Sequence, residues 1–298
     1  MKKILNRLKV GLGNKWWLFN YKLRELKLQA QFYWLLYRGS QALDVNQKSI
    51  IVFSPHQDDE TFGCGGIIAL KREQGIAVKV VFVTDGGGSH HGHPRITRSE
   101  IVEIRRQEAL SSLKNLGVEP QDIHFLDKRD GALHRMTEAE KQQTIEEMTE
   151  LLSNFQPQEV YVTHEQDRSK DHEITYELVN AAIAKSGVTV DLWQYAIWLL
   201  WDCLLFSNLK FEDLAGAYRV SIHTVQSKKK QSIETYRSQY LPIDAQTSAL
   251  LPHGFLWRFF LPYEVFFKPE YLPKEEGRGK KEAVQSNVDS NRIGIFDN

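Results

Sequence analysis

The segment that follows the first short apolar run, residues 54–60, concentrates side chains that bind metal ions. It reads Ser-Pro-His-Gln-Asp-Asp-Glu, so one imidazole and three carboxylates lie within five residues. Neighbouring carboxylates repel each other, and charges withdrawn from water need partners. A divalent cation would satisfy them, and His with Asp is a ligand set that suits Zn²⁺. The alternative is a solvated acidic turn before a helix, whose dipole favours carboxylates, and this motif alone does not decide between the two.

A second cluster follows a later apolar run. Residues 163–172 read Thr-His-Glu-Gln-Asp-Arg-Ser-Lys-Asp-His. If the two runs are parallel strands, both clusters lie at the same edge of the sheet, where open α/β sheets bind ligands. A histidine of the second cluster would then supply a third metal ligand, and this favours the metal site over the acidic turn.

The elements that would position these clusters alternate along the chain. The pattern predicts strands at 50–53, 77–83, 122–126 and 159–162, and helices at 65–74, 97–116, 138–152 and 172–184. Thr137 is expected to cap the start of the helix 138–152, with Glu140 closing a capping box. Further strands are expected at 192–201 and 218–222, and a helix at 224–240. Such alternation indicates βαβ units. We therefore expect an α/β protein with a Rossmann-like three-layer α/β/α architecture and a mostly parallel sheet, plus an N-terminal helical extension.

The composition argues against several classes of protein. The 298 residues contain 38 basic and 38 acidic side chains, so no global charge favours a nucleic-acid partner. Two cysteines are too few for a disulfide framework or a cysteine zinc cluster, and they fit a reducing compartment. No apolar run reaches the ~18 residues needed to span a bilayer, and no signal cleavage site follows the basic start. We expect a cytoplasmic protein, and the sequence leaves its oligomeric state open.

The two ends of the chain differ from its middle. Residues 1–48 are rich in basic and aromatic side chains, and a helix is expected from Trp16 to Tyr37. This extension either contacts a membrane surface peripherally or packs on the main domain or a second subunit. The main domain is expected at residues 49–272, and the polar residues 273–298 are expected to form a mobile tail.

The motifs together resemble those of the PIG-L/LmbE family of zinc-dependent N-deacetylases, over about residues 49–238. The resemblance lies in Pro-His-Gln-Asp-Asp-Glu paired with the later Asp-His. Shorter matches lie at residues 84–87, 105–109, 130–133 and 236–239. It implies a hydrolase that removes an N-acetyl group from an N-acetylglucosamine-type sugar conjugate, including glycolipids.

The resemblance also assigns roles to residues. It implies three metal ligands, which are His56, Asp59 and His172. The metal would be Zn²⁺, although this ligand set accepts other divalent ions. Asp58 would act as the general base on a zinc-bound water. Asp171 would orient the site from outside the ligand shell, and Arg105 and Asp130 would bind substrate.

One position departs from the family pattern. The family often has His-x-Asp-His where this chain has Ser-Lys-Asp-His, so Ser169 replaces a histidine that assists the transition state. Arg168, Lys170 and His164 are candidates to substitute for it. Two alternatives therefore stay open: a non-catalytic sugar- or metal-binding relative, and an amidase that acts on a non-sugar acyl amine. Retention of Asp58 favours an enzyme, because a binding protein needs no base beside its metal.

Three other groups of residues carry weaker expectations. His90, His91 and His93 are expected to be solvated loop residues, with pocket lining or an extra metal as the alternative. Cys64 is expected to pack beneath the first motif. The aromatic residues between 255 and 267 are expected to be mainly core, with some available to stack on a sugar.

Overall fold

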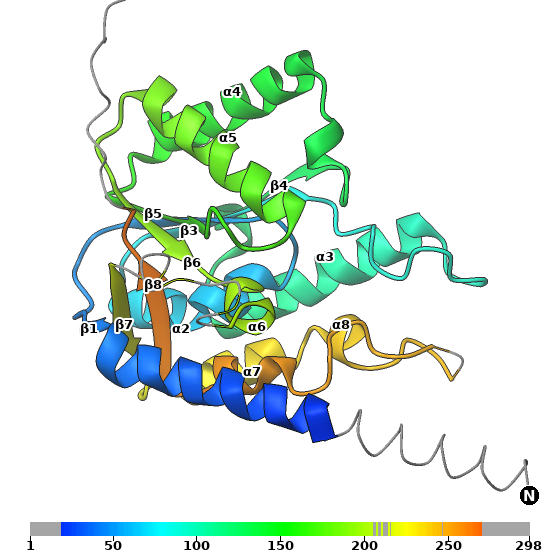
Figure 1. Cartoon of the computed structure of the whole chain (residues 1–298). Coiled ribbons are helices and arrows are strands. Elements are labelled where there is room, and N and C mark those ends of the chain that lie inside the picture. Colours follow the sequence, from blue (N-terminus) through cyan, green and yellow to red (C-terminus); the bar gives the residue numbers. More distant parts are fainter. Residues whose placement is uncertain are drawn as a thin grey trace, which may run out of the picture.

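A computed structural model describes residues 19–204, 207, 210, 214, 216–245 and 247–269. Within them, eight strands form one sheet in the order β1-β7-β8-β6-β5-β2-β3-β4 (Figure 1). Their bounds are β1 Gln41–Ala42, β2 Ile50–Ser54, β3 Val78–Thr84, β4 Ile123–Lys128, β5 Glu159–Thr163, β6 Asp191–Tyr195, β7 Ala217–Ser221 and β8 Tyr263–Phe267. The expected tail at 273–298 lies outside the described residues.

The sheet is mostly parallel, as expected. The neighbours β4, β3, β2, β5 and β6 pair in parallel. β8 pairs antiparallel with both β6 and β7, whereas β1 pairs parallel with β7. All residues of β2 and β5 are buried, which is typical of strands covered on both faces. The predicted α/β class with a Rossmann-like sheet is therefore confirmed.

Helices cover both faces of the sheet (Figure 1). The α-helices are α2 Asp59–Glu73, α3 Arg98–Asn115, α4 Glu138–Phe155, α5 Lys170–Ser186, α6 Leu199–Asp202, α7 Gln226–Ile233 and α8 Arg237–Tyr240. The shorter turns are the π-helix η1 Leu35–Gly39 and the 3₁₀ helices η2 Pro120–Asp122, η3 Leu133–Arg135 and η5 Phe255–Phe260. α4 packs on α5, and α2 packs on α7, so each face of the sheet has its own buried apolar cluster.

Local sequence explains where two of the long helices begin. Thr97 and Thr137 each accept a hydrogen bond from the backbone of a glutamate three residues later, and that glutamate bonds back to the threonine backbone. These reciprocal capping boxes satisfy donors that a helix start would leave free. The capping box expected at Thr137 and Glu140 is confirmed.

Three expected elements differ in the structure. α2 begins at Asp59 rather than at residue 65, because the last residues of the first motif themselves form the first helical turn. The expected strand 192–201 ends at Tyr195, and the chain then turns into α6. The expected helix 224–240 is broken between α7 and α8 at Tyr236, whose side chain instead reaches Glu60 of α2.

Residues 19–34 form an N-terminal helix that lies against the body of the protein, along the lower edge in Figure 1. Leu28 and Phe32 are buried, and so are Leu35 and Leu36 of η1. The hydroxyl of Tyr21 donates to the carbonyl of His253 at 2.9 Å. Among the described residues, no helix is both long and apolar enough to cross a membrane.

Candidate metal centre and active site

The two motif-bearing segments meet where the strand order of the sheet reverses. β2 and β5 are neighbours, and from β2 the chain builds β3 and β4 on one side and β5 and β6 on the other. The loop at residues 55–58 follows β2, and the loop at 164–169 follows β5. Ligand sites of open α/β sheets lie at this switch point, beyond the carboxyl ends of the strands.

Three side chains at the ends of these loops form a compact triangle of ligand atoms. His56 lies in the first loop, Asp59 is the first residue of α2, and His172 lies in the first turn of α5. His56 Nδ1 lies 3.1 Å from Asp59 Oδ2 and 3.2 Å from His172 Nε2, and the last two atoms are 3.2 Å apart. Ligand atoms of a tetrahedral zinc with bonds of about 2.0 Å would be about 3.3 Å apart, so the triangle fits a cation. The structure thus brings together the three residues that the sequence predicted as metal ligands.

A buried carboxylate outside the triangle orients His172. Asp167 Oδ2 lies 2.7 Å from His172 Nδ1, and both side chains are fully buried. The same carboxylate accepts hydrogen bonds from the backbone N–H groups of residues 197, 198 and 199. Such a carboxylate–histidine pair fixes which ring nitrogen faces a metal. Sequence reasoning did not single out Asp167; its place five residues before His172 was the available signal.

Asp171, the direct neighbour of His172 in the chain, faces the other histidine. Its Oδ2 lies 3.4 Å from His56 Nε2, and it accepts hydrogen bonds from the backbone of Gly131 and Leu133. Asp130 Oδ1 lies 3.2 Å from the same His56 nitrogen. His56 therefore offers Nδ1 to the ligand triangle while Nε2 faces two carboxylates. Asp130, expected to bind substrate, lies beside a ligand histidine and also lines the pocket.

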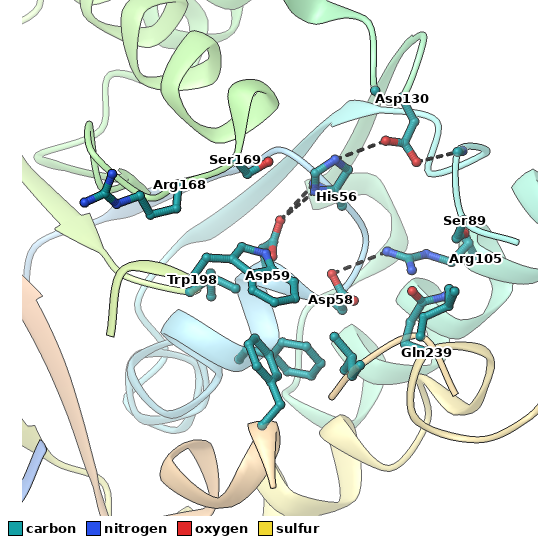
Figure 2. Close-up of a pocket in the computed structure, with 17 residues that line it drawn as sticks. His56, Asp58, Asp59, Ser89, Arg105, Asp130, Arg168, Ser169, Trp198 and Gln239 are labelled. Atoms are coloured by element: carbon teal, nitrogen blue, oxygen red, sulfur yellow. Dashed lines mark hydrogen bonds and ion pairs between the residues drawn. The ribbon is translucent and has the colours of Figure 1, made fainter. Parts of the chain in front are cut away.

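The predicted base, Asp58, lies next to the triangle and opposite Arg105 (Figure 2). Its Oδ1 is 3.3 Å from Arg105 Nη2, which also donates to the carbonyl of Gln57 at 2.5 Å. Burial raises the pKa of Asp58 to about 7, against the opposing effect of Arg105. Its φ of 151° is a backbone conformation rarely adopted by residues other than glycine, and such strain concentrates at functional sites.

The pKa values of the adjacent residues Asp58 and Asp59 are shifted in opposite directions. Burial acts to raise the pKa of Asp59 as well, but His172 and His56 outweigh it and hold that pKa well below its usual range. Burial acts instead to lower the pKa of His172, yet Asp59 and Asp167 raise that pKa to about 9. A divergence of this kind is expected when one carboxylate serves as a ligand and its neighbour exchanges protons.

The pocket above the triangle has a volume of about 470 Å³ and two unlike walls. Its polar wall contains Asp58, Ser89, Arg105, Asp130 and Gln239, and its apolar wall contains Phe62, Trp198, Leu250, Leu251 and Phe255 (Figure 2). The expectation that some C-terminal aromatic residues line a binding site applies to Phe255.

The residue that stands where the family often has a histidine also lines this pocket. Ser169 and Arg168 both line it. The Arg168 guanidinium turns away from His56, and its Nε donates to Cys203 Sγ at 2.9 Å. Lys170 instead forms a salt bridge with Glu173 at the surface. His164 is buried against Phe267. Of the three expected substitutes, only Arg168 lines the pocket.

The histidine-containing loop after β3 is attached to the C-terminal part of the chain. His90 Nε2 lies 2.7 Å from the carbonyl oxygen of Ser238, and His93 Nε2 lies 3.2 Å from Asp244 Oδ2. Only His91 of the three is exposed, so the solvated loop expected for all of them is wrong for His90 and His93. Within the described ranges, the possible metal ligands form two groups, the triangle and a second group of His56 with Asp130 and Asp171. Neither group includes these loop histidines or Cys64, which is buried beneath the motif as expected.

Fold and site together define an α/β protein with a candidate metal centre at the switch point of its sheet. Residues 51–183 match the sequence profile of the family described as PIG-L: GlcNAc-PI de-N-acetylase. The match to the PIG-L family that the motifs predicted is therefore confirmed for this part of the chain.

Two curated relatives carry the same name, "Probable N-acetyl-alpha-D-glucosaminyl L-malate deacetylase 2". The chain is 33% identical to the protein from Bacillus subtilis over 89 residues, which are 29% of this chain and 39% of the relative. It is 27% identical to the protein from Bacillus anthracis over 146 residues, which are 47% of this chain and 61% of the relative. The chain thus spans less than two thirds of either relative.

Solved structures share the fold at low sequence identity. The conserved protein TT1542 from Thermus thermophilus has a TM-score of 0.54 and 21% identity, with 77% of this chain and 100% of that chain covered. The 4-carboxy-2-hydroxymuconate hydratase GalB from Pseudomonas putida has a TM-score of 0.53 and 18% identity, with 83% and 100% covered. At these identities, the similarity establishes the fold alone.

Proposed function

We propose that this chain is a divalent-metal-dependent N-deacetylase of amino-sugar conjugates, with zinc as its metal. The observation that carries the proposal is the triangle of His56, Asp59 and His172. Two of its members, His56 and Asp59, line the same pocket as Asp58, a carboxylate outside the triangle. A catalytic zinc site needs three protein ligands, an open position and a group that moves protons. The deacetylase names of the curated relatives support the same reaction.

Each residue of the site has a role in this reaction. A cation held by the triangle would supply Lewis-acid polarisation of the amide carbonyl and a lowered pKa for water at the site. Asp58 accepts the proton of the attacking water and delivers it to the leaving amine nitrogen. Arg105 fixes the Asp58 carboxylate from 3.3 Å away. Asp167 and Asp171 hold the two histidines so that the correct ring nitrogen faces the triangle.

The two walls of the pocket support a sugar substrate. A pyranose ring presents hydroxyls at its edge and C–H groups on its faces, so it suits a cavity that is polar on one side and aromatic on the other. Arg105, Asp130 and Gln239 would bind hydroxyls, while Trp198 and Phe255 would contact a ring face or an apolar aglycone. We propose a sugar conjugate or a glycolipid as the substrate. We also propose a cytoplasmic location, since Cys64 and Cys203 are buried and form no disulfide bond with each other.

The test combines metal content with acetate release. Purified protein should carry about one zinc per chain, as a three-ligand site predicts, and Asp59→Ala should lose it. Wild type should release acetate from a panel of N-acetylglucosamine conjugates. Asp58→Asn should keep the metal but lose most of that activity, whereas Glu165→Gln, an exposed change in the β5 loop, should behave as wild type.

Three outcomes would contradict the proposal in different ways. Failure to bind zinc, even with excess metal, would eliminate the hydrolase mechanism. Metal binding without acetate release from any conjugate would favour a non-catalytic relative. Acetate release confined to acylated amines that lack a sugar would favour the amidase alternative.

A further inference from the structure

The large exposed apolar side chains that the structure describes are concentrated in one segment of the chain. Among the residues that the structure describes, eight large hydrophobic side chains are exposed; six lie between residues 19 and 37, and the others are Leu241 and Leu250. The six are Phe19, Leu23, Leu26, Tyr33, Trp34 and Tyr37. Exposed apolar residues normally lie scattered over a protein surface, and a contiguous group marks an interaction site.

The spacing places five of these side chains on one face of the N-terminal helix and of η1, which continues it. Phe19, Leu23, Leu26, Tyr33 and Tyr37 recur at intervals of three, four or seven residues, so at 3.6 residues per turn they form a single stripe. We call these five residues the apolar stripe. The opposite face carries the buried Leu28, Phe32 and Leu35, which pack into the protein. The helix therefore has one apolar face covered by the protein and one exposed apolar face. Tyr33 and Tyr37 of the exposed face also contact the rings of Trp257 and Tyr263 at the edge of the body.

Basic side chains border the apolar stripe on both sides. Lys22 lies on one flank and Lys27 on the other, and both are exposed. Glu25 is the single acidic residue of the first 40, against nine lysines and arginines, whereas the rest of the chain has 29 basic and 37 acidic residues. The chain is neutral overall, but its N-terminal segment is strongly basic. Apolar residues flanked by Lys and Arg are typical of helices that lie in the interface of an anionic membrane.

We propose that the apolar stripe docks this protein on the surface of an anionic lipid bilayer. The apolar side chains enter the acyl boundary, while Lys22 and Lys27 reach sideways to the lipid phosphates, as long basic side chains do at interfaces. A second copy of the chain is a poorer occupant, because a two-fold contact through the stripe would bring the basic flanks of both copies together. The bilayer supplies the negative charge that the same helix of another copy lacks.

The helix that carries the stripe is joined to the segment that forms the apolar wall of the pocket. Tyr21 and Glu25 contact His253, which lies between the pocket residues Leu251 and Phe255. Leu250 lines the pocket and is 43% exposed. Docking through the stripe would therefore hold this wall at a fixed position relative to the bilayer. The docking itself does not depend on the reaction proposed above.

Vesicle flotation of the full chain tests the proposal without any catalytic readout. The protein should float with vesicles of phosphatidylcholine and phosphatidylglycerol at low salt, and much less with phosphatidylcholine alone or at high salt. Lys22→Gln with Lys27→Gln should weaken binding about fivefold for each charge removed. Leu23→Ser with Leu26→Ser should weaken it at least about tenfold.

Matched controls separate the stripe from general surface effects. Lys141→Gln with Lys185→Gln removes two surface charges on α4 and α5, and should leave flotation unchanged. Leu241→Ser removes an exposed apolar side chain away from the helix, and should also have no effect. Circular dichroism should be the same for all variants, because none of the changed side chains belongs to the core.

Several results would overturn the proposal. Absence of flotation with anionic vesicles would do so, as would equal flotation of wild type and both helix variants. Light scattering that showed a dimer abolished by Leu23→Ser with Leu26→Ser would instead assign the stripe to a second copy. Loss of acetate release with retained flotation would count only against the proposed reaction.

Discussion

Asp167→Asn gives the sharpest test of how the metal centre is built. The carboxylate of Asp167 is buried and lies 2.7 Å from His172 Nδ1. It also accepts hydrogen bonds from three backbone N–H groups. Asparagine has nearly the same shape and keeps one oxygen for those N–H groups. Its amide nitrogen would then face His172 Nδ1. Because His172 directs Nε2 to the triangle, Nδ1 carries the proton, and the substitution would set two donors against each other.

The expected magnitude follows from the lost contact. Removal of a carboxylate that supports a metal-bound histidine typically lowers metal affinity 10–100-fold, which corresponds to about 1.4–2.7 kcal/mol. A hydrogen bond that involves a charged group contributes about 1.5–3 kcal/mol to folding. We therefore expect a 10–100-fold weaker zinc affinity and a free energy of unfolding lowered by about 1–3 kcal/mol.

The assay is competition between the protein and a chelating dye for zinc, followed by urea unfolding of the metal-free and metal-loaded forms. Glu165→Gln removes an exposed carboxylate from the same loop, and should change neither quantity by more than the experimental error. A wild-type zinc affinity in Asp167→Asn, measured on folded protein, would refute the inference that Asp167 positions His172 for a metal.

Three further changes test other parts of the structure. Gly63→Ala should lower the free energy of unfolding by about 1–3 kcal/mol in urea melts, because its Cβ would lie 2.3 Å from the Tyr195 ring; unchanged stability would contradict the tight packing of α2. Ser169→His should raise kcat in the acetate assay by up to about 10²–10³, and no gain would mean that Arg168 or the metal already meets this need. Arg105→Lys should lower kcat/KM at least about tenfold while zinc binding persists, because the planar guanidinium contacts both Asp58 and the Gln57 carbonyl.

The parts of the fold that the sequence predicted are those encoded by local patterns. The β-branched run 50–53 and the capping pair Thr137 and Glu140 depend on neighbours in the chain, and both appear where expected. β8, which was not predicted as a strand, pairs with β6 and β7 far from it in sequence. Its aromatic composition fits core and strand equally well, so only tertiary pairing could distinguish them.

The three candidate ligand residues could be predicted from the sequence, whereas the carboxylates that contact the two histidines could not be assigned to them. His56 and Asp59 share one motif, and the parallel sheet brings the β5 loop beside them, so topology alone joins them to His172. Which aspartate supports which histidine depends on side-chain directions at loop ends. Asp171 directly precedes His172 in the chain, but its carboxylate faces His56. The carboxylate that contacts His172 belongs to Asp167, five residues earlier. No spacing rule for loops predicts such an exchange.

Each carboxylate that contacts a ligand histidine is also held by backbone N–H groups of a loop at the pocket. Asp167 binds the 197–199 segment beside Trp198, Asp171 binds the turn at 131–133, and Asp130 binds Gly88. The orientation of the histidines and the shape of the pocket walls are therefore set by the same contacts. A loop movement on substrate binding would change the hydrogen bonds of these carboxylates and, through them, the metal ligands. Because of this coupling, substitutions in the pocket loops should alter metal affinity even where they touch no ligand.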